Sequence, residues 1–207
     1  ISLAVAPCKV IAILKANAYG LGVRPIAEAL AKAGACGFGV AELNEALQLK
    51  DIGLPVQIHE SVLKEEVPEA VANGIIIPVF NYEIAEFISA EARRQGKTAL
   101  CHFAIDTGMG RLGILSAEAV EVVKKIYGLP NLKFNGIYSH FPIAYQTGGE
   151  YTLRQVNTFT AIVEELRRDG ISFEKVHIAN SDAINNFTSI TCRPPFTHVR
   201  TGINLYG

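Results

Sequence analysis

The sequence predicts an α/β domain, and most simply a (β/α)8 barrel in which eight parallel strands alternate with helices. Short apolar runs and helix-like segments follow one another along almost all of the 207 residues. The first run, Val10–Leu14, contains no polar residue, which is typical of a strand covered by helices on both faces of a parallel sheet. The same alternation also fits an open, doubly wound sheet, which is the competing topology. At this length, one domain spanning residues 1–207 is expected.

Each predicted strand is a short run of mostly apolar residues with Gly, Pro or polar residues at its limits. The strands are predicted at Val10–Leu14, Phe38–Ala41, Val56–His59, Ile75–Phe80, Ala99–Asp106, Gly136–Phe141, Val176–Asn180 and His198–Thr201. The segments between them have the apolar spacing of amphipathic helices. Helices are predicted at Pro25–Ala33, Glu42–Ile52, Lys64–Ala72, Tyr82–Arg94, Ala117–Tyr127 and Thr152–Asp169, with a short helical turn at Ser181–Phe187.

Several helix ends carry recognisable signals. Pro25 suits the first turn of a helix, and Ser116 is a candidate N-cap. A glycine follows most helical segments, as expected for a left-handed C-terminal residue; these are Gly34, Gly53, Gly74, Gly96, Gly128 and Gly170. The repeated order of strand, helix, glycine and strand favours right-handed βαβ units. The longest irregular stretch, Pro142–Glu150, follows the sixth strand and is a candidate active-site loop.

The composition excludes several classes of partner. The net charge of −1 and the lack of a basic run argue against nucleic acid. No apolar stretch approaches the ~18 residues of a membrane span, so no membrane partner is expected. The four cysteines have neither metal-binding nor disulfide spacing, which favours reduced thiols in a cytoplasmic protein. The chain does not begin with Met and stops just after Asn204-Leu205-Tyr206, so we expect part of a longer protein.

Lys15 is the first candidate for chemistry. It lies at the carboxyl end of the first predicted strand, which is where α/β folds place their active sites. A lysine amine in that position is suited to forming a Schiff base with an aldehyde. Position alone is a weak signal, because lysines often follow strands simply where a loop meets water.

Two further strand ends carry candidate residues. The fifth strand ends in Asp106–Gly113, in which three glycines permit a close approach to a ligand and Arg111 can bind a carboxylate, phosphate or phenolate oxygen. The sixth strand ends near His140, in an apolar context where most histidines are structural. His102 and His177 fall on predicted strands too and are assigned no role.

The seventh and eighth strands suggest an anion site. Ser181, after Asn180, opens a helix, where it either caps that helix or helps to bind an anion. Gly202, close to Arg200, can offer its backbone N–H without side-chain obstruction. Phosphate is often held after strands seven and eight of a barrel, and closure would bring Lys15 alongside. An amine, a phosphate cradle and two arginines together suit pyridoxal phosphate.

One motif favours a different cofactor. Gly20-Leu21-Gly22-Val23-Arg24-Pro25 follows a strand and opens a helix, as a dinucleotide-binding motif does. Pro25, however, stands where that motif needs its third glycine, and the first glycine comes several residues after the strand. A nicotinamide cofactor is therefore the less favoured interpretation.

The candidate motifs resemble those of the alanine racemase family, which are fold-type III enzymes that use pyridoxal phosphate. The similarity covers nearly the whole chain, and the motifs occur in the family's order. It rests on Lys15-Ala16-Asn17-Ala18-Tyr19-Gly20, Asp106–Gly113, Ser139-His140-Phe141, Ala179-Asn180-Ser181 and the stretch from Val199-Arg200 to Tyr206-Gly207.

The resemblance implies a role for each candidate. Lys15 would bind the cofactor's aldehyde and act as one of two catalytic bases. Arg111 would contact the phenolic oxygen and, with Met109, the substrate. Arg200 would bond to the pyridine nitrogen, with His140 behind it. The phosphate would be held by Tyr19, Ser181, Gly202 and Ile203, with Asn180 close by.

The sequence also departs from the family pattern. Leu21 stands where the family often has His, and Ala104 stands where many members have a carbamylated lysine that braces the arginine of the next loop. The second base of the family is a tyrosine in a carboxyl-terminal β domain, supplied across a homodimer, and that domain is absent from these residues. No metal is expected.

The resemblance implies a racemase that interconverts L- and D-alanine for peptidoglycan synthesis, with serine or lysine as other possible substrates. Two alternatives remain open. One is a barrel that carries pyridoxal phosphate without turnover. The other is a barrel-type amino-acid decarboxylase, against which Arg200 speaks, because an arginine does not readily give its proton to the ring nitrogen.

Overall fold

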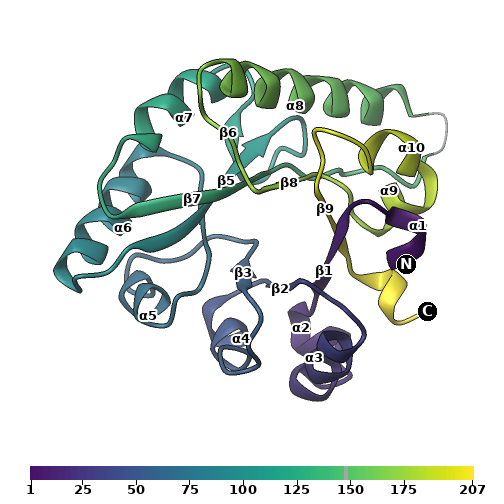
Figure 1. The fold of residues 1–207 in the computed structure, drawn as a ribbon, viewed down its shortest axis with the longest axis horizontal. Coiled ribbons are helices and arrows are strands. Elements are labelled where there is room, and N and C mark those ends of the chain that lie inside the picture. Colours follow the sequence, from purple (N-terminus) through teal and green to yellow (C-terminus); the bar gives the residue numbers. More distant parts are fainter. Residues whose placement is uncertain (147–148) are drawn as a thin grey trace.

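The computed structural model describes residues 1–146 and 149–207, and every predicted strand is present in it (Figure 1). The observed strands are β1 (Lys9–Ile13), β2 (Gly37–Val40), β3 (Val56–Ile58), β4 (Ile77–Val79), β5 (Ala99–Asp106), β7 (Leu132–Tyr138), β8 (Lys175–His177) and β9 (His198–Thr201). The limits of β5 and β9 match the predictions, and those of the other predicted strands differ by a few residues. One further strand, β6 (Ile114–Leu115), was not predicted and pairs with β5.

The predicted helices are also present, although their ends move. They are α3 (Val23–Lys32), α4 (Leu43–Leu47), α5 (Val67–Ala72), α6 (Tyr82–Arg94), α7 (Ala119–Tyr127), α8 (Glu150–Arg168) and α9 (Ser181–Asn186). Four short elements were not predicted: α1 (Ser2–Val5), α2 (Lys15–Tyr19), α10 (Thr188–Thr191) and the 3-10 turn Ile203–Leu205. Figure 1 shows α3 to α8 around the outside of the strands.

Two predictions about helix ends were wrong. Ser116 does not cap α7, because the chain continues through Ile114–Leu115 and the backbone N–H of Ser116 donates to the carbonyl of Asp106. Gly128 follows α7 with a φ of −81°, so it is not left-handed as the other helix-terminal glycines are. The predicted loop Pro142–Glu150 includes residues 147 and 148, which lie outside the described residues.

The strands form two parallel sheets. One sheet has the order β3-β2-β1-β9, and the other has the order β4-β5-β7-β8. Every pairing between these strands is parallel. Apart from the short β6, neighbouring strands follow one another along the chain except at β1, which lies between β2 and β9. The structure is therefore an α/β fold with parallel strands, in which the first strand pairs with the last.

Backbone hydrogen bonds also cross both gaps between the two sheets. Between β3 and β4, the N–H of Ile76 donates to the carbonyl of Val56 over 2.9 Å, and Ile58 donates to Ile76 over 3.1 Å. Between β8 and β9, the N–H of Thr197 donates to the carbonyl of Val176 over 2.9 Å. The two sheets are thus bridged on both sides.

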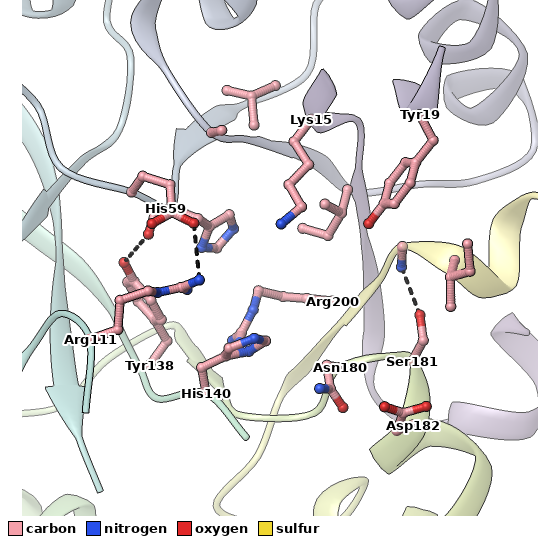
Figure 2. Close-up of a pocket in the computed structure, with 16 residues that line it drawn as sticks. Lys15, Tyr19, His59, Arg111, Tyr138, His140, Asn180, Ser181, Asp182 and Arg200 are labelled. Carbon is pink, nitrogen blue, oxygen red and sulfur yellow. Dashed lines mark hydrogen bonds and ion pairs between the residues drawn. The ribbon is translucent and has the colours of Figure 1, made fainter. Parts of the chain in front are cut away.

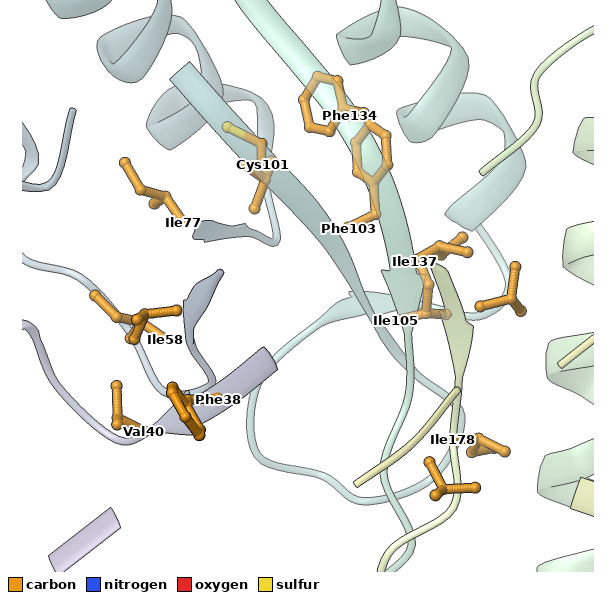
Figure 3. Packing of buried hydrophobic residues seen from close by; sticks show 14 of the residues in the cluster. Phe38, Val40, Ile58, Ile77, Cys101, Phe103, Ile105, Phe134, Ile137 and Ile178 are labelled. Carbon is orange, nitrogen blue, oxygen red and sulfur yellow. The ribbon is translucent and has the colours of Figure 1, made fainter. Parts of the chain in front are cut away.

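Aliphatic and aromatic side chains from both sheets pack into one continuous core (Figure 3). The rings of Phe103 and Phe134 stack with their centroids 4.0 Å apart. Burying a side chain of this size contributes roughly 1.5–3 kcal/mol, so the core fixes the strands that carry the pocket. Within the described residues, no helix is both long enough and apolar enough to cross a membrane.

Candidate active site

A cavity of about 230 Å³ opens at the carboxyl ends of the strands (Figure 2). All of the predicted site residues line it except Met109, which borders a smaller cavity beside Arg111. The residues that meet at the main cavity are Lys15, Tyr19, Arg111, His140, Asn180, Ser181, Arg200, Gly202 and Ile203. They come from segments far apart in the sequence, so the parallel strand order brings them together.

Lys15 begins a turn whose winding is unusual. Ala16, Asn17, Ala18 and Tyr19 have φ values of 53° to 56°, which places α2 in the left-handed region. For a residue other than glycine this conformation costs roughly 1–2 kcal/mol, and only Asn and Asp adopt it with some ease. The sequence pattern predicted no helix or strand between Leu14 and Pro25. The turn instead holds the Lys15 amine and the Tyr19 hydroxyl toward the same cavity (Figure 2).

Hydrogen bonds within the turn offset part of this cost. The backbone N–H of Gly20 donates to the carbonyl of Ala16 over 2.9 Å, and that of Gly22 donates to the carbonyl of Asn17 over 3.0 Å. The Asn17 side chain accepts from the N–H of Val23 over 2.8 Å, at the start of α3. Asn17 therefore joins the turn to the helix that follows.

Ser181 and Gly202, the core of the predicted anion site, meet at the cavity. The Gly202 N–H donates to the Ser181 hydroxyl over 3.0 Å, although α9 and the end of β9 are distant in sequence. A side chain on Gly202 would place its Cβ 2.6 Å from the Tyr19 hydroxyl, so this close approach requires glycine. Burial raises the pKa of Tyr19, which keeps its hydroxyl protonated and able to donate. Hydroxyls and a backbone N–H are suitable ligands for a phosphate.

The structure also decides which residue caps α9. The side chain of Asn180 accepts from the N–H of Ala183 over 3.0 Å, so Asn180 is the N-cap. Ser181 is the first residue of the helix, and its hydroxyl faces the cavity instead of the helix end. Of the two roles considered for Ser181, capping is therefore excluded.

Arg200 lies almost completely buried at the base of the cavity, with 4% of its surface exposed. Its guanidinium donates to the carbonyls of Ser139 over 2.6 Å and His177 over 3.2 Å, and it contacts the Nδ1 atoms of His177 at 2.5 Å and His140 at 3.3 Å. Burial lowers the pKa of Arg200 to about 10, so it stays charged at neutral pH. No carboxylate within the described residues pairs with it.

The imidazoles next to Arg200 are neutral. Burial, followed by the charges of Arg200, Arg111 and Lys15, lowers the pKa of His140 to about 3. Burial and Arg200 likewise hold the pKa of His177 well below its usual value. A neutral ring has one nitrogen free to accept, so both Nδ1 atoms accept from the guanidinium. His177, to which the sequence assigned no role, is thus a direct partner of Arg200.

Sequence analysis also missed a group of aromatic rings at the cavity, of which His59 and Tyr138 line it and His177 is fully buried. His59, Tyr138 and His177 pack together, with ring centroids 5.2 to 6.2 Å apart. Glycines on the neighbouring strands make room for the imidazoles, because a Cβ on Gly39 would lie 2.6 Å from His59. Gly136 likewise makes room for His102. A glycine on one strand beside a histidine on the next was the signal in the sequence that could have revealed these rings.

Arg111 is held quite differently. The carboxylate of Asp106 accepts from the N–H groups of Gly108 and Gly110, which shapes the loop that carries Arg111. The guanidinium itself pairs with Glu60, just after β3, at 3.3 Å. Ala104 is buried and can offer no polar contact. Glu60, which sequence analysis did not select, is therefore what contacts Arg111 in place of a lysine on β5.

Together, the fold and the pocket define a class of protein. This is an α/β domain with parallel strands whose carboxyl ends present a lysine amine, hydroxyl and backbone N–H groups suited to an anion, and a buried arginine in one cavity. A phosphorylated small molecule with a group that reacts with an amine would suit this arrangement.

Comparison with known proteins identifies the family. A sequence profile described as "Alanine racemase, N-terminal domain" matches residues 2–207, and the chain therefore belongs to this family. An alanine racemase of Methanococcus maripaludis is 38% identical over 205 residues, which cover 96% of this chain and 53% of that protein. The chain spans about half the length of the curated relatives it matches.

Solved structures agree with this assignment. A Clostridium difficile alanine racemase in complex with cycloserine is 30% identical and has a TM-score of 0.91, with coverage of 97% of this chain and 55% of that one. A Bartonella henselae alanine racemase with covalently bound pyridoxal phosphate is 28% identical and has a TM-score of 0.85, with coverage of 99% and 58%. The fold and the order of the motifs are thus those of the family.

Proposed function

We propose that this chain is the cofactor-binding part of an alanine racemase, an enzyme that uses pyridoxal phosphate to interconvert L- and D-alanine. One observation carries the proposal: the Lys15 amine faces the same cavity as the Ser181 and Gly202 anion-binding pair. An aldehyde carrying a phosphate is the kind of ligand that satisfies both groups. The family membership and the covalently bound cofactor of the Bartonella relative support the same assignment.

The residues present fit this cofactor. Lys15 would bind the aldehyde, and the phosphate would be held by the Tyr19 and Ser181 hydroxyls and the backbone N–H groups of Gly202 and Ile203, with Asn180 close by. The absence of a side chain at Gly202 leaves the space that a phosphate oxygen needs. When bound, the cofactor withdraws electrons from the substrate's Cα and so acidifies its C–H bond.

Arg200 would control how strongly the ring withdraws electrons. Its guanidinium is fixed by carbonyls and neutral imidazoles, so it can only donate to the pyridine nitrogen. The nitrogen then stays unprotonated, and withdrawal into the ring is moderate. A moderate effect suits the return of a proton to Cα better than the loss of carbon dioxide. This argument favours racemisation over decarboxylation.

Lys15 would move the proton on one face of Cα, while Arg111, with Met109 nearby, holds the substrate carboxylate. Racemisation also needs a base on the opposite face. By family resemblance this base is a tyrosine in a second domain, contributed by the other subunit of a homodimer. The product D-alanine would supply peptidoglycan synthesis in the cytoplasm.

We also infer that the eight strands other than β6 close into a barrel. The bonds between Val56 and Ile76 and between Val176 and Thr197 support closure, because they bridge the two gaps between the sheets. A closed ring places Lys15, after β1, next to the phosphate groups after β8 and β9, as the proposed reaction needs.

Two measurements test the proposed function. Added pyridoxal phosphate should produce the absorbance of a lysine-bound cofactor in the wild-type protein, and Lys15→Ala should lack it. The full-length protein should then exchange the Cα proton of L- and D-alanine with solvent. Uptake of the cofactor without exchange would favour the carrier alternative, and release of carbon dioxide would favour the decarboxylase.

A further inference from the structure

We propose that Glu45, on α4, is a positioning residue for the cofactor pocket. Its carboxylate holds the left-handed turn that carries Lys15 and Tyr19. The inference deepens the proposed function and rests on it. Glu45 does not line the cavity, so it would act through Lys15 and Tyr19, the two ends of the turn, which do line it.

The carboxylate joins three segments of the fold. One oxygen of Glu45 accepts from the backbone N–H of Asn17 over 3.2 Å, in the middle of the turn. The other oxygen accepts from the N–H of Ala41 over 2.9 Å, directly after β2, and Ala41 lines the cavity. Asn17 stands two residues from Lys15 and two from Tyr19. A single side chain therefore fixes the centre of the turn against the neighbouring strand end.

A carboxylate suits this position better than any neutral group. Both of its contacts are N–H donors, and both of its oxygens accept. Glu45 is only 9% exposed, and within the described residues no Lys or Arg forms an ion pair with it. Hydrogen bonds to a charged acceptor are stronger than neutral ones. A glutamine would have to turn its NH2 group toward one of the two N–H groups and would lose that bond.

The effect should fall on binding more than on folding. The turn is costly for Ala16, Ala18 and Tyr19, so it persists only while its surroundings hold it. Ser181 and Gly202 come from α9 and the end of β9, which Glu45 does not touch. Loosening the turn would therefore move the amine and the Tyr19 hydroxyl away from a phosphate site that stays in place.

Glu91 provides a matched control. It lies on α6, away from the cavity, and is also 9% exposed. Its carboxylate accepts from Arg94 over 2.7 Å and from Gln95 over 2.6 Å. Glu91→Gln therefore removes an equally shielded carboxylate without touching the turn. A general loss of stability would affect both variants alike.

The test is an absorbance titration of the full-length protein with pyridoxal phosphate and, separately, with pyridoxal, which lacks the phosphate. Glu45→Gln should raise the dissociation constant for pyridoxal phosphate at least tenfold, while Glu91→Gln stays within about twofold of wild type. The preference for pyridoxal phosphate over pyridoxal should also shrink, because Tyr19 no longer meets the phosphate. If Glu45→Gln does not fold, Glu45→Asp should show a smaller change in the same direction.

Three outcomes would overturn the inference. An unchanged affinity of Glu45→Gln for pyridoxal phosphate would show that Glu45 does not position the turn, while leaving the proposed function intact. Equal losses in Glu45→Gln and Glu91→Gln would assign the effect to folding alone. A wild-type protein that takes up no pyridoxal phosphate would overturn the proposed function itself, and this inference with it.

Discussion

The two arginines that face the cavity have opposite surroundings. Arg200 extends from strand β9, is 4% exposed, and is surrounded by carbonyl oxygens and neutral imidazoles. Arg111 extends from a Gly-rich loop, its side chain is 43% exposed, and one carboxylate, that of Glu60, pairs with it. One guanidinium is built into the core, and the other is held by a single ion pair at the edge of the cavity.

This difference suggests a division of labour. A guanidinium with several fixed acceptors keeps one orientation whether or not a ligand is present, as a permanent contact to a cofactor ring requires. A half-exposed ion pair contributes little free energy, so under the proposed function Arg111 would release Glu60 in order to bind a substrate carboxylate.

Replacing each arginine by leucine should separate the two most clearly. Arg200→Leu leaves the buried carbonyl of Ser139 without a donor and removes one of the two donors to the carbonyl of His177, and we expect the free energy of unfolding to fall by about 3 kcal/mol. Arg111→Leu should cost less than about 1 kcal/mol, because its ion pair is exposed to water. Chemical denaturation would measure both, and equal losses would contradict the contrast.

The second-largest loss of stability is expected where a new side chain fills the space occupied by a buried imidazole ring. In Gly136→Ala, the new Cβ would lie 2.5 Å from the His102 ring, which packs 5.7 Å from that of His177. Overpacking of this kind costs roughly 1–3 kcal/mol, so we expect a loss of about 2 kcal/mol. Gly128→Ala is the control, because nothing lies within 4 Å of its Cβ and its φ is −81°. A similar loss in both variants would show that the imidazoles do not need this space.

Acid should weaken the Arg200 side of the cavity. The pKa of His140 is lowered to about 3, against about 6.5 in the unfolded chain, so between these values the unfolded state binds more protons. Stability therefore falls as the pH falls, by about 1.5 kcal/mol for His140 alone between pH 6.5 and pH 5. Thermal unfolding across this range would test it, and His140→Asn should flatten the slope. An unchanged slope in that variant would show that His140 is not the group responsible.

The smallest effect is expected at Glu60. Glu60→Gln breaks the ion pair with Arg111, and the free energy of unfolding should change by less than about 1 kcal/mol. Glu83→Gln, which breaks an exposed pair with Lys64, is the matched comparison in denaturant unfolding. A much larger loss in Glu60→Gln would mean that Arg111 is anchored as firmly as Arg200.

Most of the fold could be predicted because local signals agree with it. A strand such as Val10–Leu14 is apolar throughout because most of its residues are buried in the core, and α6 begins and ends where its pattern predicts. The strand-end residues could be gathered into one pocket because parallel strands all end on the same side. The resemblance to a known family then added their individual roles, which remain predictions.

The features that could not be predicted depend on contacts between segments that are distant in the sequence. Ala16 and Ala18 give no sign of a left-handed turn, since the contacts that hold it come from elsewhere in the chain. The pairing of Glu60 with Arg111 joins two loops about 50 residues apart, and a sequence does not tell which charges meet. His177 was passed over because a lone strand histidine is usually structural, and its contact with Arg200 depends on the packing of β8 against β9.

The mirror-handed winding after Lys15 has a consequence for laboratory evolution. Alanine is less comfortable than glycine in this conformation, so selection for heat resistance alone would favour glycine at Ala16 or Ala18. Glycine would also let the neighbouring amine sample more directions. Variants selected only for thermal stability should therefore accumulate glycine at these positions and, under the proposed function, bind the cofactor's aldehyde less well. A selection that also requires catalytic turnover should retain both alanines.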